Sequence, residues 1–398
     1  MDRLKKSDKM KTMEYKKQDL NPYAIKIAPH LWQDSCLASE SSLHQIAPYI
    51  GKMKSTMAHA LINAYSLPGD VVCDPFVGSG IVALECLIAE RGIIASDINP
   101  YAVTLTKAKL TPPSSIDEAL EKAKSYCNKM KTLARNVRIN NVPRWVRTFF
   151  HPKTLRELCA LTELLKKNRE YFLLSCLLGI LHHQRPGFLS YPASHLVPYL
   201  RTNKFPREKF PELYGYRHVD LRLFKKIQRI YRRFPYINPD MPRVCKLKNA
   251  TNLNLPKESI DAVITSPPYM NALDYARDNR LRLWFLGITE YKRYDKKVPN
   301  NCQKFLNLME QCLRNVHYGL RSKGKCVLVI GEVKRTKKTI NTAQLLIDLA
   351  TKNIGAFECE DIIEDEIPDI RRARKNGACT KREWIVILKK KRVINGKS

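Results

Sequence analysis

VVCDPFVGSG (71–80) predicts a short buried strand that runs directly into a loop containing two glycines. The next residues, IVALECLIAERG (81–92), repeat apolar side chains with a helical period and end at Gly92, which is typical of a helix C-cap. IIASD (93–97) is a second short apolar run, and NPYAVTLTKAKL (99–110) has the pattern of a second helix. Two strand–helix units joined by short loops predict an α/β fold with a parallel sheet.

Further strand-like runs appear only near the end of the chain, and helical patterns separate them. One parallel sheet, interrupted by a large insertion, explains this order. We expect the strands at 260–266, 326–332, 357–364 and 382–389, and the helices at 303–320 and 340–352.

A chain of 398 residues is long enough for two or three domains. Between the two groups of strands the pattern changes to helix-like runs with many aromatic and basic residues. We expect a flexible basic arm at 1–20, the first part of an α/β domain at 21–110, a largely helical insertion at 111–242, and the second part of the α/β domain at 243–398.

The chain is strongly basic, with 70 Lys and Arg against 38 Asp and Glu, which gives a net charge of +32. A solvated surface would explain a small excess, but self-repulsion of this size favours a polyanionic partner such as nucleic acid. Residues 111–250 hold 28 basic and 10 acidic residues. The densest stretch is 201–233, where basic side chains alternate with Phe and Tyr, so we expect the nucleic acid to contact the insertion.

The N-terminal residues are charged and lack the apolar core of a signal peptide, and no stretch approaches the roughly 20 apolar residues of a membrane helix. We therefore expect a cytosolic protein that does not enter a membrane. The 12 cysteines form no Cys-x-x-Cys pair and no cluster with histidine at zinc-ligand spacing. We expect them to be free thiols in the core, without a bound metal.

The loop at 75–80 is the first candidate site. Its glycines allow a tight turn against a ligand, and the helix that follows presents free N–H groups. The loop differs from the G-x-G-x-x-G pattern of dinucleotide sites, and no Lys-Ser/Thr pair follows it as in a phosphate loop. It suits a zwitterionic ligand without a phosphate, although a tight strand–helix turn without a ligand explains the pattern equally well.

Asp97 ends the second predicted strand and is the second candidate. A carboxylate in this position can accept hydrogen bonds from both hydroxyls of a ribose. It could instead cap the helix that begins near Pro100, a role that Asn99 could also fill.

DAVITSPPYMNALDY (261–275) carries the most specific pattern, a strand that runs into Ser-Pro-Pro-Tyr. Two prolines fix the backbone and remove two N–H donors, so carbonyl oxygens and the serine hydroxyl form a rigid group of acceptors. Such a group suits an –NH2 group, and an aromatic side chain beside it can stack on a planar base. An ordinary proline-rich turn is the alternative, and the glycine loop in the same chain makes it the weaker one.

The pair DPFVGSG (74–80) and SPPY (266–269) resembles the conserved motifs of the amino-methyltransferases that act on DNA. The segment 47–65 resembles the one that precedes the glycine loop in this family, and NATNL (249–253) resembles the loop beside the adenine of the cofactor. The resemblance covers most of 44–110 and 245–390. It implies a Rossmann-like, S-adenosylmethionine-dependent methyltransferase sheet with helices on both faces.

The resemblance also implies roles for individual residues. Ile81 replaces a threonine that is frequent after the loop, and Asn249 stands where an acid is common. The residues expected to bind S-adenosylmethionine are Asp74, Pro75, Phe76, Gly78, Gly80, Asp97 and Asn249, and those expected to hold the target base are Ser266, Pro267, Pro268 and Tyr269.

The implied reaction is a direct methyl transfer to an exocyclic amino group of a base flipped out of duplex DNA. Methylation at C5 of cytosine is excluded, because that family uses a Pro-Cys nucleophile and this chain has no Pro-Cys dipeptide. In the family that the chain resembles, serine before Pro-Pro favours N4 of cytosine over N6 of adenine, although both amino groups fit the same acceptors. An RNA base methyltransferase, a glutamine-modifying protein methyltransferase and a DNA-binding protein with an inactive methyltransferase fold are the further alternatives.

The partners implied are double-stranded DNA in a prokaryotic cytosol and, as a candidate, a cognate restriction endonuclease. A helix face that is only solvated is the alternative reading of residues 225–233. The phosphate contacts that we expect in the insertion are Arg201, Lys204, Arg207, Arg229, Arg232 and Arg233.

Overall fold

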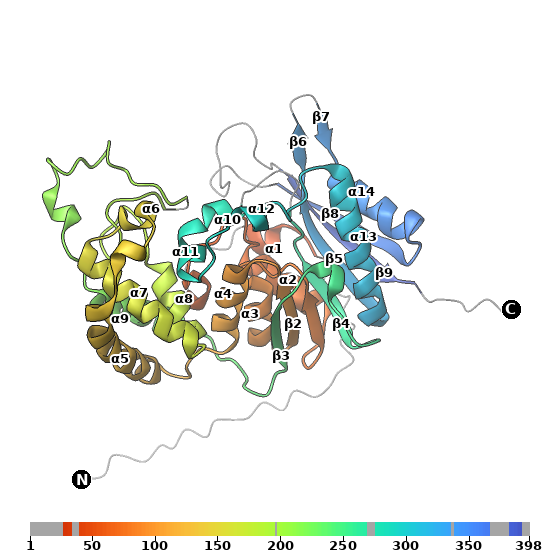
Figure 1. Cartoon of the computed structure of the whole chain (residues 1–398). Coiled ribbons are helices and arrows are strands. Elements are labelled where there is room, and N and C mark those ends of the chain that lie inside the picture. The colour runs from red at the N-terminus through yellow and green to blue at the C-terminus, as the bar shows by residue number, and fades with distance from the viewer. Residues whose placement is uncertain are drawn as a thin grey trace, which may run out of the picture.

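A computed structural model describes residues 27–33, 40–195, 197–268, 275–335, 338–366 and 382–391. Two parts lie side by side, one containing a sheet with helices on it and the other almost entirely helical (Figure 1). The basic arm expected at 1–20 lies outside the described residues.

The sheet has seven strands in the order β3-β2-β1-β4-β5-β9-β8. The first five strands are mutually parallel, and β9 runs antiparallel to both of its neighbours. A separate hairpin joins β6 (Val333–Arg335) to β7 (Lys338–Ile340). The strands of the large sheet are β1 (Val71–Asp74), β2 (Gly92–Asp97), β3 (Arg243–Leu247), β4 (Ile260–Thr265), β5 (Leu320–Gly331), β8 (Phe357–Glu366) and β9 (Arg382–Lys390).

The prediction of an α/β fold is confirmed, but the prediction of an entirely parallel sheet is wrong. β9 lies between β5 and β8, with Leu328 opposite Val386 in an antiparallel register. An apolar run that is buried on both faces has the same pattern in either direction, so its sequence does not specify the direction. β3 was not expected, because Cys245 is its only buried residue and it lies at the edge of the sheet.

The first helix after the glycine loop ends earlier than its sequence indicates. It covers Ile81–Ile88, and Glu90 rather than Gly92 adopts a left-handed conformation, with φ of 60°. Gly92 instead begins β2, where an added Cβ would come within 2.6 Å of Pro242 Cγ. The C-cap prediction for Gly92 is therefore wrong, and close packing of the neighbouring chain accounts for the glycine.

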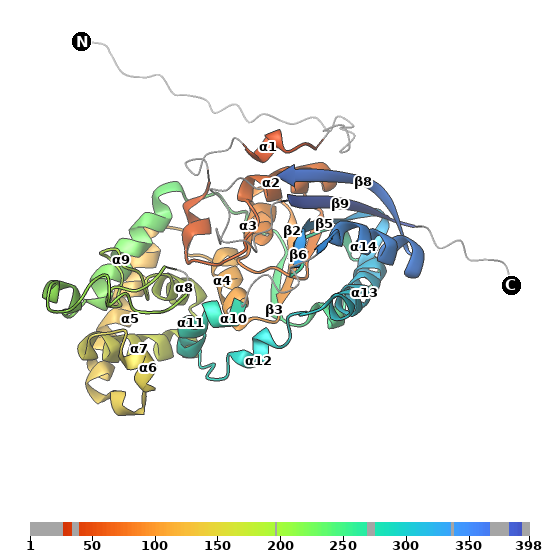
Figure 2. The ribbon, with the colours of Figure 1, turned by 90° about the horizontal axis from the view of Figure 1, so that it is seen from above.

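Helices cover both faces of the sheet, as expected (Figures 1 and 2). Alternate side chains of β5 point to opposite sides, so that Val327 and Val329 pack with the helices before and after β1 while Cys326 and Leu328 pack under α13. One face carries α2 (Ser55–Tyr65), α3 (Ile81–Ile88) and α4 (Pro100–Leu110), and the other carries α13 (Cys302–Gly319) and α14 (Thr342–Asp348), which continues as a π-helical turn, Leu349–Asn353.

The edge of the sheet at β8 is tied to the N-terminal side of the chain. The short helix α1 (His30–Gln33) buries Trp32, whose Nε1 donates a hydrogen bond of 2.8 Å to Asp365 Oδ2. Gln33 Nε2 donates to the other oxygen of the same carboxylate at 2.8 Å.

The helical part lies between α4 and β3 in sequence, as the predicted insertion does. Its helices are α5 (Ile116–Leu133), α6 (Arg144–Arg147), α7 (Pro152–Lys167), α8 (Tyr171–Gly179) and α9 (Val219–Ile230). Short 3-10 turns cover Ser42–Gln45, Ala134–Asn136, Ile139–Asn141, Pro211–Tyr214, Tyr231–Arg233 and Ala250–Asn252.

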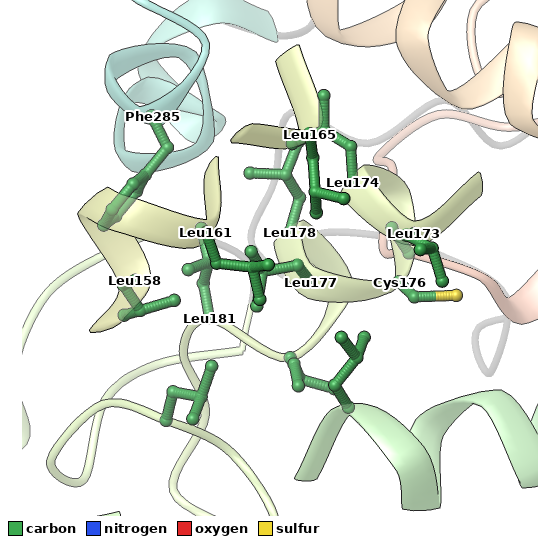
Figure 3. Close-up of a cluster of buried hydrophobic side chains, with 14 of the residues drawn as sticks. Leu158, Leu161, Leu165, Leu173, Leu174, Cys176, Leu177, Leu178, Leu181 and Phe285 are labelled. Atoms are coloured by element: carbon green, nitrogen blue, oxygen red, sulfur yellow. The ribbon is translucent and has the colours of Figure 1, made fainter. Parts of the chain in front are cut away.

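The helical part shares one core with elements from outside the insertion. Leu158 and Leu161 of α7 and Leu177 of α8 belong to the same buried cluster as Phe285 of α11 (Arg280–Phe285) (Figure 3). Tyr101 and Leu105 of α4 also belong to it. The division into separate domains therefore stays a prediction. In the part of the chain that the structure describes, no helix combines the length and apolarity needed to cross a bilayer.

Candidate active site

The order of the strands predicts a cleft at the carboxyl ends of the central strands. From β1 the chain moves through β2 to β3 on one side, and it then returns to β4 on the other side of β1. In open α/β sheets, ligands bind at such a reversal, outside the carboxyl ends of the strands. An open cleft of about 820 Å³ lies there. The predicted residues that line it are Pro75, Phe76, Gly78, Asp97, Asn249, Ser266 and Pro268.

Asp74 joins the two strands that flank the reversal. It ends β1, and its Oδ1 accepts a hydrogen bond of 2.6 Å from the hydroxyl of Thr265, the last residue of β4. The same oxygen accepts from the Phe76 N–H at 3.1 Å. Burial raises the pKa of Asp74 to about 7, although both hydrogen bonds lower it. Asp74 thus fixes the glycine loop relative to the strand that leads into Ser266, but it is absent from the described lining of the cleft.

The glycines of the loop have different roles. Gly78 has φ of 50° and lines the cleft, and a Cβ added to it would meet the ring of Tyr49 at 3.5 Å. Gly80 has φ of 72°, and its Cβ would lie 2.8 Å from Thr106 Oγ1 on α4. Gly80 is the N-cap of α3 and does not line the cleft. Its structural contribution is to let α4 pack closely against the loop.

Lys109 of α4 stabilises the same loop through a hydrogen bond to its backbone. Its side chain is buried, and Nζ donates a hydrogen bond of 2.6 Å to the Ser79 carbonyl oxygen. Burial lowers the pKa of Lys109 well below its ordinary value. This contact could not be predicted from the sequence, because a lysine in the last turn of a helix is usually solvated or interacts with the helix dipole.

Asp97 faces the cleft and also organises the loop. Its Oδ2 accepts from the Gly78 N–H at 2.9 Å, and its Oδ1 accepts from the Asn99 N–H at 2.8 Å. Burial raises its pKa to about 6, against the lowering effect of these hydrogen bonds. The helix α4 is capped by Asn99, whose side chain accepts from the Tyr101 N–H at 3.0 Å. The capping role is therefore filled, and each Asp97 oxygen retains acceptor capacity for a ligand.

Two of the four residues predicted to bind the base line the same cleft, directly after β4. Ser266 and Pro268 line it, and Pro267 is buried between them. Tyr269 lies outside the described residues. Asn249, at the entrance to the 3-10 turn after β3, lines the cleft and accepts from the Thr251 N–H at 3.2 Å.

Several lining residues were not singled out by sequence. Tyr49 lies within the resembling segment 47–65 and stacks on Tyr101 and Tyr275, with ring centroids 6.0 and 6.4 Å apart. The two short helices α10 (Tyr275–Asp278) and α12 (Lys292–Asp295) contribute to the rim. Their sequence shows no motif, so only the fold of this segment against the strand ends brings them there.

The six predicted phosphate contacts lie away from the cleft lining and fall into two groups. The first group comes shortly after Pro198, whose carbonyl oxygen accepts a hydrogen bond from Arg280 of α11. It consists of Arg201, Lys204 and Arg207. Arg229, Arg232 and Arg233 are exposed at the end of α9, where the hydroxyl of the neighbouring Tyr231 donates to the Pro113 carbonyl oxygen beyond the end of α4.

The stretch 225–233 is only partly a solvated face. Lys226 is buried, and its Nζ donates a hydrogen bond of 2.7 Å to the Gln45 carbonyl oxygen. Burial lowers its pKa to about 8.

The chemistry of the cleft suits a nucleoside-like ligand with a positive charge. Phe76, Ile98 and Leu308 offer apolar surface, and Asp97 offers a carboxylate beside the glycine loop. A ligand with phosphates would need cations at this loop, and the position after Gly80 is Ile81 rather than the Lys-Ser/Thr of a phosphate loop. Within the described ranges, no group of three or more His, Cys, Asp or Glu side chains could hold a metal ion.

Comparison with known proteins finds methyltransferases that are similar to parts of this chain. Residues 2–108 match a family model for N6 and N4 methyltransferases, described as DNA methylase. The type II methyltransferase M.MvaI of Kocuria varians is 25% identical over 240 residues, which cover 54% of this chain and 50% of the relative. The type II methyltransferase M.XycI of Xanthomonas campestris pv. cyanopsidis is 38% identical over 72 residues, covering 17% of this chain and 24% of that protein.

The matched part thus spans half or less of each of these relatives. The resemblance to the DNA amino-methyltransferase family is confirmed by these matches, which do not distinguish N4 from N6 specificity. Among solved structures, an S-adenosylmethionine-dependent methyltransferase of Methanosarcina mazei covers 83% of this chain and 96% of its own, at 11% identity and a TM-score of 0.34. Similarity at this level carries no argument about activity.

Proposed function

We propose that this chain transfers a methyl group from S-adenosylmethionine to the exocyclic N4 amino group of cytosine in duplex DNA. The observation that carries the proposal is a single cleft lined by the glycine loop, by Asp97 and by Ser266 with Pro268. The DNA methylase match over 2–108 and the type II methyltransferase relatives support the same reaction class.

The loop side of the cleft would hold the cofactor. Asp97 would accept the ribose hydroxyls, Asn249 would lie near the adenine, and Pro75, Phe76 and Gly78 would line the methionine side. Asp74 and Gly80, which do not line the cleft, would position the loop rather than touch the cofactor. When bound, S-adenosylmethionine supplies an activated methyl group on a sulfonium.

The part of the cleft that follows β4 would hold the target base. Ser266 and the Pro267 carbonyl would accept the amino hydrogens, which favours a tetrahedral nitrogen with a localised lone pair. Pro268 would keep this part rigid, and Tyr269 would stack on the base. The chain would therefore contribute by positioning a base flipped from the duplex and by stabilising the methyl transfer electrostatically. No covalent enzyme intermediate would form.

The choice of cytosine rests on the serine that precedes Pro267 and Pro268, which favours cytosine in the family that the chain resembles. The DNA contacts at Arg201, Lys204, Arg207, Arg229, Arg232 and Arg233 are part of the proposal. A cognate restriction endonuclease stays a prediction from the resemblance.

The test is to incubate the protein with labelled S-adenosylmethionine and mixed-sequence duplex DNA, and then to digest the DNA and identify the methylated nucleoside. We expect N4-methylcytosine, with the Ser266→Ala protein as a matched control for contaminating activity. N6-methyladenine would correct the base and keep the reaction class. Label in RNA or in protein, with none in DNA, would overturn the proposal.

A further inference from the structure

A second basic surface lies outside the insertion, on α12 at the rim of the cleft. We call Lys292, Arg293, Lys296 and Lys297 the α12 cluster, and all four residues are exposed. Lys297 itself lines the cleft. Figures 1 and 2 place α12 beside α10 and far from α9, so this surface is separate from the basic residues at the end of α9.

Two cations of this cluster contact the ring of a tyrosine that also lines the cleft. Tyr294 is buried, with 9% of its surface exposed. The Arg293 guanidinium lies 4.9 Å from the ring centroid and donates a hydrogen bond of 2.9 Å to the Tyr294 hydroxyl. Lys297 Nζ lies 5.7 Å from the same centroid. These contacts keep two positive charges at the mouth of the cleft.

The one acidic residue within this stretch has another role. Asp295 accepts hydrogen bonds from the Ala276 N–H at 2.8 Å and from the Arg277 N–H at 3.0 Å. It thereby fixes α12 against the start of α10, whose Tyr275 and Ala276 line the cleft. The carboxylate is engaged with backbone groups, so it ties the cluster to the cleft wall.

The cations of this cluster lie close together along the chain. Lys292 and Arg293 begin α12, and Lys296 and Lys297 follow its last residue, so four like charges repel one another over six residues. A bound polyanion would remove this repulsion and release counterions.

We propose that the α12 cluster binds the phosphates of the DNA strand next to the nucleotide whose base enters the cleft. The inference rests on the proposed function, because the base must reach Ser266 past this rim. Duplex DNA fits better than an acidic protein, since closely spaced phosphates match four exposed cations on α12 and the turn that follows it, and the arginine offers a planar donor pair for a phosphate. Contacts here fix the register of the strand, and the recognised bases are read elsewhere.

The test compares the salt dependence of duplex DNA binding by the full chain and by an Arg293→Gln/Lys297→Gln variant, between about 50 and 200 mM salt. Loss of two phosphate contacts should reduce the slope of log K against log salt by about 1.8. The variant should also need more DNA to reach half-maximal methylation.

A matched control is Lys124→Gln/Lys129→Gln on α5, where Lys129 lies over the Tyr126 ring at 5.6 Å and both lysines are exposed. This variant also removes two charges and one cation–ring contact, and it should keep the slope of the unchanged protein. Arg293→Lys/Lys297→Arg should restore the slope, which a merely structural role of Arg293 beside Tyr294 would not produce.

An unchanged slope in Arg293→Gln/Lys297→Gln, in a protein that binds and methylates DNA, would overturn this inference and leave the proposed function intact. The same holds if the α5 control loses as much slope. If the unaltered protein neither binds nor methylates DNA, the proposed function fails, and the inference fails with it.

Discussion

The Thr265 hydroxyl donates a hydrogen bond of 2.6 Å to Asp74 Oδ1, and this contact joins the glycine loop to the strand that carries the Ser-Pro-Pro motif. The two residues are 191 positions apart in the chain and end the neighbouring parallel strands β1 and β4. Asp74 belongs to the glycine-loop motif, and Thr265 directly precedes the Ser-Pro-Pro motif. The hydrogen bond therefore connects the two motifs that the sequence singled out.

Replacing Thr265 with Val should lower the free energy of unfolding by about 1–3 kcal/mol, because valine keeps the shape of the side chain but leaves the buried carboxylate of Asp74 without this donor. Chemical denaturation at neutral pH measures the change. Thr251→Val, at a partly exposed position of a 3-10 turn, is the control. Equal stability of the two variants would mean that the contact does not join the strands.

Replacing Asp74 with Asn should make stability less dependent on pH. The pKa of Asp74 is about 7 in the folded protein and near 4 in the unfolded chain, so the folded state holds the proton more tightly. Its contribution to stability is complete below pH about 4 and is lost as pH rises through about 7. Between pH 4 and 8, the free energy of unfolding should fall more steeply with pH for the unaltered protein than for Asp74→Asn. Parallel curves would contradict this assignment.

Asp97 should make cofactor binding dependent on pH. Its pKa is about 6 because the carboxylate is buried, and a charged carboxylate is the better acceptor for ribose hydroxyls. Affinity for S-adenosylmethionine, measured by calorimetry, should be constant above pH 7 and should fall by up to about tenfold per unit well below pH 6. Asp97→Asn should bind more weakly and lose this dependence. A variant that retained the full dependence would exclude Asp97 as its origin.

Gly80→Ala should destabilise the protein more than Gly69→Ala. Both glycines have positive φ, 72° and 89°, so both variants carry the cost of a left-handed alanine. Only at Gly80 would the new Cβ meet a neighbour, Thr106 Oγ1 at 2.8 Å, whereas nothing lies within 4 Å of Gly69. The difference in melting temperature between the two variants reports the packing of α4 against the loop. No difference would show that this packing adjusts freely.

Ser266→Ala should reduce the rate of methyl transfer by roughly 10- to 1,000-fold, because one acceptor of the amino hydrogens is lost. Affinity for S-adenosylmethionine should change little, since Ser266 follows β4, whereas Asp97 ends β2 and Gly78 belongs to the loop after β1. Single-turnover methylation and cofactor titration separate the two effects. An unchanged rate would remove Ser266 from the reaction.

The sequence determined the elements that carry the site. The strands that include Asp74, Asp97 and Thr265 could be predicted because short apolar runs, glycines and prolines act locally on the backbone. The same local rules indicated the glycine loop and the Ser-Pro-Pro turn, and Asp97 and Ser266 do lie together in one cleft.

Only the tertiary structure decided which of these residues face the cleft and which support it. Gly80 and Lys109 act through close contact with residues distant in sequence, and no local pattern encodes such a contact. The direction of β9 likewise depends on its neighbours β5 and β8 rather than on its apolar run. Local sequence fixes backbone geometry within a few residues, whereas burial, and with it the raised pKa values of Asp74 and Asp97, exists only once distant strands exclude water from the same place.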